Sequence, residues 1–190
     1  MTDYDLIADD YEKFFNKENY ADEDLELMKM LPYPLSKKVL DIGCGTGLGY
    51  MLLQRRSFGG FEYFGIDPSR KMLEKFFSKT VIHKVVDYRQ TTFEDFETDR
   101  KFDIAISTYG SVSYVDPKSI TKLKDILKAG GQFFLVFYKD DYTPITHEVF
   151  KDVVQMSNYK FSEYKPYLEN ISKDVKFTEW HNYIIAEGTV

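Results

Sequence analysis

Residues 39–49 read VLDIGCGTGLG, in which an apolar run leads through an acid to four glycines at alternate positions. Glycine loses more backbone freedom on folding than any other residue, so this concentration of glycine needs a physical reason. Two reasons compete: glycine permits the positive φ of a tight turn, and its missing side chain lets a ligand reach the backbone. Either reason predicts a buried strand over 37–42, a tight turn, and a helix over 46–56.

The alternation of apolar strand and amphipathic helix continues on both sides of this turn. Further strands are expected over 61–66, 85–91, 102–108 and 132–138, and further helices over 4–15, 21–31, 69–77 and 119–127. Near-continuous apolar strands separated by helices are typical of a parallel sheet that is covered on both faces. The predicted fold class is therefore α/β, with a doubly wound and mostly parallel sheet in three α/β/α layers.

The C-terminal part of the chain has a different pattern. Residues 147–156 and 162–171 have helical spacing, and two apolar runs flank His181-Asn182 closely enough to pair as an antiparallel hairpin at the sheet edge. Gly130-Gly131 is interpreted as the end of the preceding helix, with a glycine in the left-handed cap conformation. No linker divides the chain, so we expect one domain over 1–190. It would comprise a helical lid over 1–36, a cofactor-binding core over 37–138 and substrate-side elements over 139–190.

Composition and charge narrow the class of partner. The chain has 190 residues and a formal net charge of −6, which disfavours a nucleic-acid partner because such binding draws on Lys and Arg at phosphates. A single cysteine excludes an internal disulfide, and no long apolar run or signal-like segment is visible. We therefore expect a cytoplasmic protein without a membrane span. The 15 Tyr and 16 Phe are an unusually large aromatic share.

The glycine pattern also indicates what kind of ligand the turn would hold. Backbone amides at a helix N-terminus favour a negative group, and Asp67, 24 positions after Gly43, is placed to accept hydrogen bonds from ribose hydroxyls. A dinucleotide turn would need glycine where this chain has Leu48, and no Gly-Lys-Ser/Thr follows as a phosphate loop requires. The distinguishing feature is Asp41, an acid two residues before the first glycine.

With these residues the sequence strongly resembles the class I S-adenosylmethionine-dependent methyltransferases, whose first motif is an acid followed by alternate glycines. The resemblance covers residues 4–138 in register. It is carried by YDLIADDY, DIGCGTG, GIDPS, TFEDF, KFDIAIS and LKAGGQFFLVF, in this order. The family implies S-adenosylmethionine as cofactor, S-adenosylhomocysteine as product, and the Rossmann-like sheet.

The resemblance also implies roles for individual residues. Cofactor binding is expected from the motif residues and from positions near the departing methyl group, namely Asp41, Gly43, Gly45, Gly47, Asp67, Phe93, Glu94, Ser107 and Tyr11. Phe93 would pack on the adenine, with Glu94 near its amine, and Tyr11 would close over the cofactor. Relatives commonly have an acid where this chain has Thr92, which weakens the carry-over to Phe93 and Glu94.

Several of these residues also have a purely structural interpretation. Asp67 could cap the following helix, and Tyr11 could serve only in helix packing. Cys44 is interpreted as a small residue in a close-packed turn. The hydroxyls of 107–114 could hold a substrate or satisfy turn backbone.

The catalytic candidates are His147, a general base in the segment after the fifth strand, and Tyr109. The three histidines, His83, His147 and His181, lack metal-ligand spacing, and Asp140-Asp141 has no third acid at the end of the fourth strand. We therefore expect no metal site.

The predicted function is methyl transfer to a small molecule, with nitrogen or oxygen as the acceptor atom. The sulfonium activates the methyl group, so proximity and orientation supply most of the catalysis, and a dedicated base is optional. Two alternatives remain at this point. One is an RNA or protein methyltransferase, and the other is a non-catalytic S-adenosylmethionine-binding regulator or partner subunit. The sequence predicts no particular oligomeric state.

Overall fold

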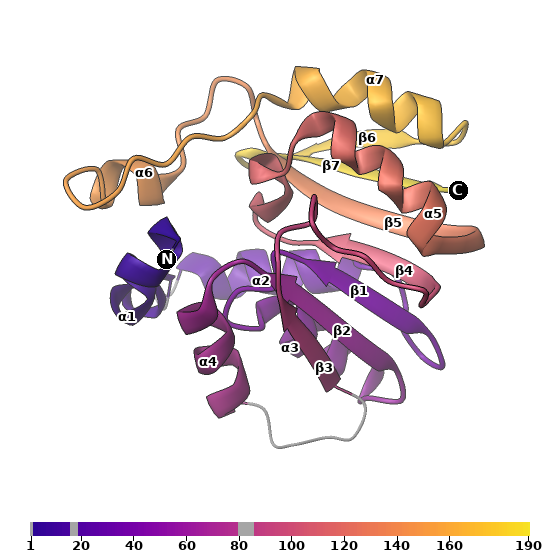
Figure 1. Ribbon diagram of the computed structural model, residues 1–190, viewed down its shortest axis with the longest axis horizontal. Coiled ribbons are helices and arrows are strands. Elements are labelled where there is room, and N and C mark those ends of the chain that lie inside the picture. The colour runs from indigo at the N-terminus through magenta and orange to yellow at the C-terminus, as the bar shows by residue number, and fades with distance from the viewer. Residues whose placement is uncertain (1, 16–18, 80–85) are drawn as a thin grey trace.

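The computed structural model describes residues 2–15, 19–79 and 86–190 of the chain. Its strands form one seven-stranded sheet in the order β3-β2-β1-β4-β5-β7-β6 (Figure 1). Strands β1 to β5 run parallel, whereas β7 is antiparallel to β5 and β6 is antiparallel to β7. The predicted fold class is confirmed. Among the described residues, no helix is both long enough and apolar enough to cross a membrane.

The elements follow the predicted alternation closely. The strands are β1 (Lys38–Ile42), β2 (Glu62–Asp67), β3 (Val86–Gln90), β4 (Phe102–Ser107), β5 (Leu127–Tyr138), β6 (Lys176–Trp180) and β7 (Tyr183–Thr189). The α-helices are α1 (Asp3–Phe15), α2 (Asn19–Met30), α3 (Leu48–Ser57), α4 (Arg70–Lys79), α5 (Leu123–Ile126), α6 (Ile145–Val149) and α7 (Phe161–Ile171). Two 3₁₀ helices, η1 (Ser111–Tyr114) and η2 (Pro117–Lys122), precede α5. The expected hairpin after α7 is confirmed.

The side chains of the central strands alternate between two apolar layers, as the pleat of a strand requires. In β5, Phe133 and Leu135 belong to one core cluster, whereas Phe134 and Val136 belong to the other. The first cluster includes residues of α5 and α7, which lie together in Figure 1, and the second includes residues of α2, α3 and α4. Because both faces are covered, the inner strands read as continuous apolar runs.

The start of β5 differs from the prediction. The helix expected over 119–127 is the 3₁₀ helix η2 followed by the four-residue α5, and β5 already begins at Leu127. Phe102 of β4 pairs with Leu127 and Ile104 pairs with Gln132, so residues 128–131 loop out between the two pairs. Gly130 takes its positive φ of 74° inside this irregularity and caps no helix. The interpretation of Gly130-Gly131 as a helix end is therefore wrong.

The helix expected over 147–156 is also shorter than predicted. The helix α6 covers only Ile145–Val149, and the chain continues as turns and irregular structure. Phe150 and Val154 are buried in a small cluster with Ile7 of α1. Their four-residue spacing therefore reflects contact with α1 and not a continuous helix.

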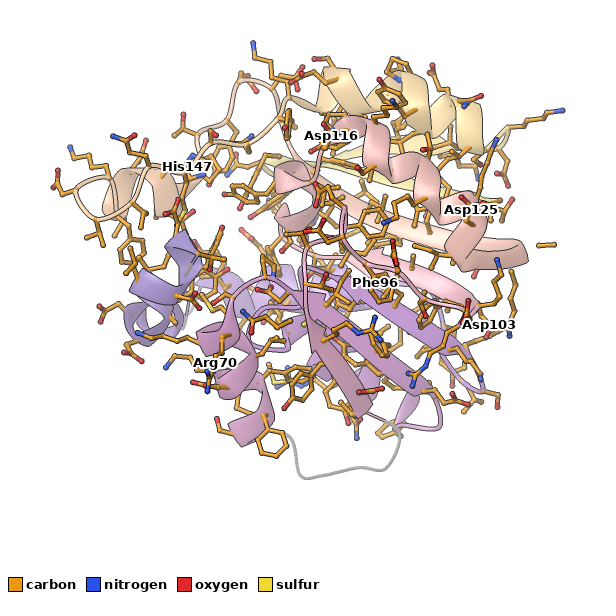
Figure 2. All side chains as sticks on the ribbon, viewed as in Figure 1. Arg70, Phe96, Asp103, Asp116, Asp125 and His147 are labelled. Carbon is orange, nitrogen blue, oxygen red and sulfur yellow. The ribbon has the colours of Figure 1, made fainter. Side chains whose placement is uncertain are left out.

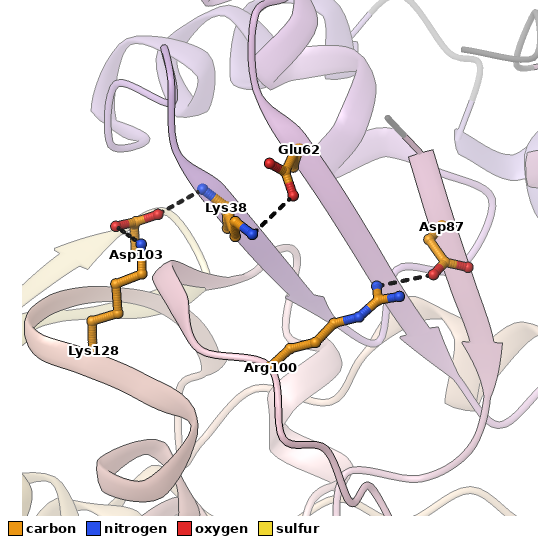
Figure 3. Close-up of polar contacts among 6 residues, drawn as sticks. All are labelled: Lys38, Glu62, Asp87, Arg100, Asp103 and Lys128. Atoms are coloured by element: carbon orange, nitrogen blue, oxygen red, sulfur yellow. Dashed lines mark hydrogen bonds and ion pairs between the residues drawn. The ribbon is translucent and has the colours of Figure 1, made fainter. Parts of the chain in front are cut away.

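Exposed ion pairs fix the edge of the sheet where the parallel strands begin (Figure 3). The backbone N–H of Lys38 donates to Oδ2 of Asp103 at 2.8 Å, and Nζ of Lys38 lies 3.3 Å from Oε2 of Glu62. Asp103 also pairs with Lys128, next to the irregular start of β5. Ion pairs that are exposed to solvent contribute little stability. We therefore interpret these contacts as setting strand register at the edge of the sheet opposite the carboxyl ends of the parallel strands.

Candidate functional site

A cavity of about 750 Å³ lies at the carboxyl ends of β1, β2, β4 and β5. Its lining comes from both ends of the sequence, because α1 and α2 contribute residues together with the segments that follow the strands. In open parallel sheets, ligands bind at this edge, beside the strand where the chain reverses its direction across the sheet. The strand order places that reversal between β1 and β4.

The glycine turn, residues 43–47, forms one boundary of the cavity. Gly43, Gly45 and Gly47 all have positive φ, and the N–H groups of Gly43 and Cys44 donate to the carbonyl oxygen of Ile66 at 2.9 and 3.0 Å. A Cβ on Gly47 would lie 2.1 Å from Cδ2 of Phe76, so this glycine serves packing and does not line the cavity. A Cβ on Gly45 would meet no protein atom within 4 Å. The space beside Gly45 is therefore open on the cavity side.

Asp67 ends β2 and lines the cavity next to the glycine turn. Its Oδ2 accepts the N–H of Gly45 at 2.9 Å, and its Oδ1 accepts the N–H of Ser69 at 2.8 Å. Each carboxylate oxygen keeps further acceptor capacity, so both hydroxyls of a diol can be accepted without displacing a protein donor. Burial raises the pKa of Asp67 to about 6, although the two N–H bonds act in the opposite direction.

The helix after Asp67 is capped by its neighbour. Oγ of Ser69 accepts the N–H of Met72 at 3.2 Å and donates to Oδ1 of Asp5 at 2.7 Å. Asp5 also accepts the N–H of Lys71 and is itself buried, and its pKa is lowered to about 2 by these hydrogen bonds, which outweigh the effect of burial. This contact joins α1 to the start of α4. The sequence analysis missed it, because the partners lie 64 residues apart.

Besides Gly47, two more residues that were expected to bind cofactor do not line the cavity. Asp41 is fully buried below the glycine turn, where its Oδ2 accepts the hydroxyl of Tyr63 at 2.6 Å. Its Oδ1 has no hydrogen-bond partner among the described residues, and burial raises its pKa to about 7. Ser107 is also fully buried, and its hydroxyl donates to the carbonyl oxygen of Ile42 at 2.8 Å. Both side chains support the turn from beneath, which corrects their expected placement in the ligand site.

The segment after β3 lines the cavity as the sequence predicts, with both Phe93 and Glu94 among the lining residues. Nζ of Lys122 donates to the carbonyl oxygens of Phe93, Glu94 and Phe96 at 3.0, 2.8 and 2.8 Å. Oε1 of Glu94 in turn accepts the backbone N–H of Asp116 at 2.6 Å. A cation on η2 therefore fixes this segment, a role for Lys122 that no local pattern indicated.

Much of the remaining lining is formed by six tyrosines, which we call the tyrosine wall: Tyr11, Tyr4, Tyr114, Tyr138, Tyr183 and Tyr109. Consecutive rings in this order touch, with centroids 6.0, 5.8, 6.2, 5.6 and 5.7 Å apart. Tyr142 packs on the wall from the segment after β5 and also lines the cavity. The wall thus joins α1, η1, β5, β7 and the end of β4 in one aromatic surface.

Tyr109 lines the cavity at the end of β4 and has a positive φ of 50°. Its hydroxyl donates to Oδ1 of Asp24 at 2.6 Å, so a residue of α2 meets the end of the fourth strand. Burial and the Asp24 carboxylate raise the pKa of Tyr109. Burial also raises the pKa of Asp24, while the Tyr109 hydrogen bond and Arg55 act in the opposite direction. Asp24, which also lines the cavity, was missed by the sequence analysis.

His147 does not line the cavity. It lies on α6, which Figure 2 places beside α1, and its Nε2 is 2.8 Å from the hydroxyl of Tyr114. Partial burial lowers its pKa. Tyr114 lines the cavity and His147 does not, so the role of His147 as a base beside the substrate stays a prediction. His181 contacts Glu26 at the tip of the hairpin, and His83 lies outside the described residues.

Other predicted positions can now be placed. Tyr11 lines the cavity, with its ring against Tyr4, and its role as a lid stays a prediction. Cys44 is buried, and a Cβ on Gly65 would lie 2.7 Å from its Sγ, so it fills a close-packed turn. Among the described residues, no group of three or more His, Cys, Asp or Glu side chains could hold a metal ion.

Comparison with known proteins agrees with this geometry. Residues 39–131 match the family model described as "Methyltransferase domain". A ubiquinone biosynthesis O-methyltransferase of Actinobacillus pleuropneumoniae is 36% identical over 107 residues, which are 52% of this chain and 44% of that relative. The chain thus spans less than half of the length of this curated relative.

Solved structures share the fold at low sequence identity. An S-adenosylmethionine-dependent methyltransferase from Mesorhizobium loti has a TM-score of 0.69 at 15% identity, covering 87% of this chain and 96% of that one. Geranyl diphosphate C-methyltransferase from Streptomyces coelicolor, solved with S-adenosyl-L-homocysteine, has a TM-score of 0.68 at 14% identity, covering 89% and 80%.

Proposed function

Since the chain belongs to the class I S-adenosylmethionine-dependent methyltransferases, we propose that it transfers a methyl group from S-adenosylmethionine to a small molecule. The observation that carries the proposal is the cavity at the carboxyl edge of the sheet, which the glycine turn, Asp67 and the tyrosine wall line together. Its volume of about 750 Å³ lies within the usual range for small-molecule sites.

The residues on one side of the cavity fit the cofactor. Asp67 offers carboxylate oxygens to the ribose hydroxyls, and its hydrogen bonds to Gly45 and Ser69 fix its orientation before the ligand arrives. The open space beside Gly45 would admit the amino-acid part of the cofactor against the backbone. Phe93 and Glu94 would border the adenine, held by Lys122. When bound, S-adenosylmethionine supplies a methyl group already activated by its sulfonium.

The other side of the cavity would hold the acceptor. Tyr109 and Asp24 lie at the end of β4, and the wall continues from there to α1. Closely packed rings exclude water, and excluding water keeps the acceptor oriented and prevents hydrolysis. The contribution of this chain is thus positioning and desolvation. His147, which does not line the cavity and whose Nε2 contacts the hydroxyl of Tyr114, is not used as a base in this scheme.

The small size of the acceptor is supported by three observations. The cavity is shared with the cofactor, so the remaining volume suits a small molecule. The net charge of −6 opposes binding of a polyanion. The curated relative from Actinobacillus pleuropneumoniae is named a ubiquinone biosynthesis O-methyltransferase, so its name refers to the biosynthesis of a small molecule.

The proposal is tested by methyl transfer from tritiated S-adenosylmethionine into fractions of a cell extract. Label is expected in the fraction below the size of macromolecules, and Asp67→Ala, as the matched control, is expected to lose it. Label found only in the RNA or protein fraction would contradict the small-molecule acceptor. Tight cofactor binding without transfer to any fraction would contradict catalysis and favour a regulatory protein.

A further inference from the structure

We propose that the acceptor side of the cavity is a site for a cationic amine, held between the tyrosine wall and the carboxylate of Asp24. This inference rests on the proposed function and names the class of its acceptor. It is carried by three features of the described residues: the π faces that line the cavity, the placement of its charges, and the position of its titratable groups.

The tyrosine wall presents an aromatic surface of a kind that attracts cations. A ring face carries the negative end of a quadrupole, and a cation within about 6 Å of it is stabilised most where water is excluded. Six wall rings touch in series along the cavity, and Tyr142 adds another beside Tyr138 and Tyr183. Burial raises the pKa of Tyr138 and Tyr183, so these phenols stay neutral at physiological pH. The wall therefore offers rings and hydroxyls without offering charge.

Asp24 is the carboxylate that adjoins this wall. Its Oδ1 is held by the Tyr109 hydroxyl at 2.6 Å, and Tyr109 packs on Tyr183. Oδ2 of Asp24 accepts no hydrogen bond from the part of the chain that the structure describes, so an ammonium N–H can be accepted there. The Tyr109 hydrogen bond fixes the carboxylate toward the wall. A cation that binds between the ring faces and this carboxylate is stabilised by both.

The charges lining the cavity favour a positive ligand. The carboxylates in the lining are Asp3, Asp24, Asp67 and Glu94, and the cations are Arg55 and Lys79. Asp67 and Glu94 lie on the cofactor side, and Lys79 ends α4 on that side. Arg55 is exposed and acts on Asp24 by favouring its ionised form. On the acceptor side, the cavity is therefore lined by the carboxylates of Asp3 and Asp24 and by the exposed guanidinium of Arg55.

Nitrogen suits this site better than oxygen as the acceptor atom. A hydroxyl acceptor benefits from a base that removes its proton, but His147 does not line the cavity and the phenols of Tyr138 and Tyr183 remain protonated. An amine that binds as ammonium releases one proton to solvent, and its lone pair then forms the N–C bond. The electron pair of the breaking C–S bond stays on sulfur, so the products are a methylated ammonium ion and S-adenosylhomocysteine.

The test is a set of calorimetric titrations of the full chain saturated with S-adenosylhomocysteine, using three probes of similar shape: 2-phenylethylamine, 2-phenylethanol and 3-phenylpropionate. We expect the amine to bind about tenfold more tightly than the alcohol, and the carboxylate to bind most weakly. Asp24→Asn is expected to weaken amine binding about tenfold and to leave the alcohol unchanged. Tyr142→Leu should weaken amine binding, whereas Tyr142→Phe, which keeps the ring, should not.

Each opposite result would overturn the inference. These results are equal or tighter binding of the alcohol or the carboxylate, unchanged amine binding in Asp24→Asn, or no amine binding up to millimolar concentration. Unchanged S-adenosylhomocysteine affinity in Asp24→Asn establishes that the variant is folded. If S-adenosylhomocysteine itself does not bind, the proposed function fails, and the same probe series on the ligand-free protein still decides the preference for a cation.

Discussion

The two sides of the cavity are built in different ways. On the cofactor side, the glycine turn and Asp67 position ligand-binding groups through backbone geometry, because Gly45 donates to Asp67 and Gly43 donates to the end of β2. On the acceptor side, the tyrosine wall consists of side chains from elements spread from α1 to β7. A site made of backbone depends on a short stretch of sequence. A site made of side chains depends on the whole topology.

This difference predicts distinct responses to mutation. A side chain added at Gly47, where the glycine permits close packing, should lower stability. A side chain added at Gly45, where the glycine leaves open space, should lower ligand affinity. Changes at the Tyr109 end of the tyrosine wall should affect the acceptor and leave the cofactor unaffected. Substitutions on each side and a pH titration test whether the two sides act separately, from the largest expected effect to the smallest.

The largest effect is expected for Gly47→Ala. The new Cβ would overlap the ring of Phe76 and would sit at a φ of 90°, which costs an L residue strain. Overpacking and the left-handed backbone together should lower the free energy of unfolding by about 3 kcal/mol. Urea unfolding measures this loss.

Gly45→Ala is the matched control, because its Cβ would enter open space. It should cost only about 1 kcal/mol of stability from its positive φ, while weakening S-adenosylhomocysteine binding. Equal destabilisation by both variants would contradict the separate roles of packing and ligand contact within the turn.

The second prediction concerns the pair beneath the turn. Tyr63→Phe removes the donor of the one hydrogen bond that the buried Asp41 side chain makes within the described residues. Leaving a buried charged acceptor unpaired should cost about 2 kcal/mol at pH 8. Because the pKa of Asp41 is raised to about 7, the carboxyl is protonated at pH 5.5 and the cost should shrink there. An identical loss at both pH values would exclude Asp41 as the cause.

The third prediction is a pH dependence of cofactor binding. The pKa of Asp67 is raised to about 6, and its ionised form is the better acceptor for ribose hydroxyls. S-adenosylhomocysteine should therefore bind with nearly its full affinity at pH 7 and about tenfold more weakly at pH 5. Calorimetry across this range measures it. Asp41 also titrates in this pH range, and Asp67→Asn separates the two carboxyl groups. This variant should bind S-adenosylhomocysteine weakly, and its affinity should depend less on pH. An unchanged pH dependence in the variant would assign the effect to Asp41.

The smallest effect is expected for Tyr109→Phe on the acceptor side. The ring and its packing on Tyr183 and Trp180 remain, and only the hydrogen bond to Asp24 is lost. Stability should fall by about 1 kcal/mol, and S-adenosylhomocysteine affinity should stay within about twofold of the wild type. A large loss of cofactor affinity would show that the two sides of the cavity are coupled.

The same contrast explains how much of the molecule could be predicted from sequence. The parallel sheet, the hairpin, the glycine turn and the lining position of Asp67 follow from local patterns of apolar residues, glycine and acid, and the lining position of Phe93 follows from the family resemblance. The buried position of Asp41 does not, because it depends on β2 pairing beside β1 so that Tyr63 reaches the carboxylate.

Long-range partners were the main omission. Tyr109 and Asp24 lie 85 residues apart in the sequence, and Lys122 and Phe93 lie 29 apart. No local spacing connects such pairs. His147 was expected to border the substrate because it lies in the segment after the fifth strand, but it does not line the cavity, and its Nε2 contacts the hydroxyl of Tyr114.

The most direct test of the account is one pair of titrations on two variants, Asp67→Ala and Asp24→Asn, each with S-adenosylhomocysteine and with 2-phenylethylamine. The account predicts that Asp67→Ala loses the cofactor product and keeps the amine, whereas Asp24→Asn keeps the product and binds the amine about tenfold more weakly. Loss of both ligands in both folded variants, or of neither, would contradict a cavity divided into a backbone-built cofactor side and a tyrosine-walled acceptor side.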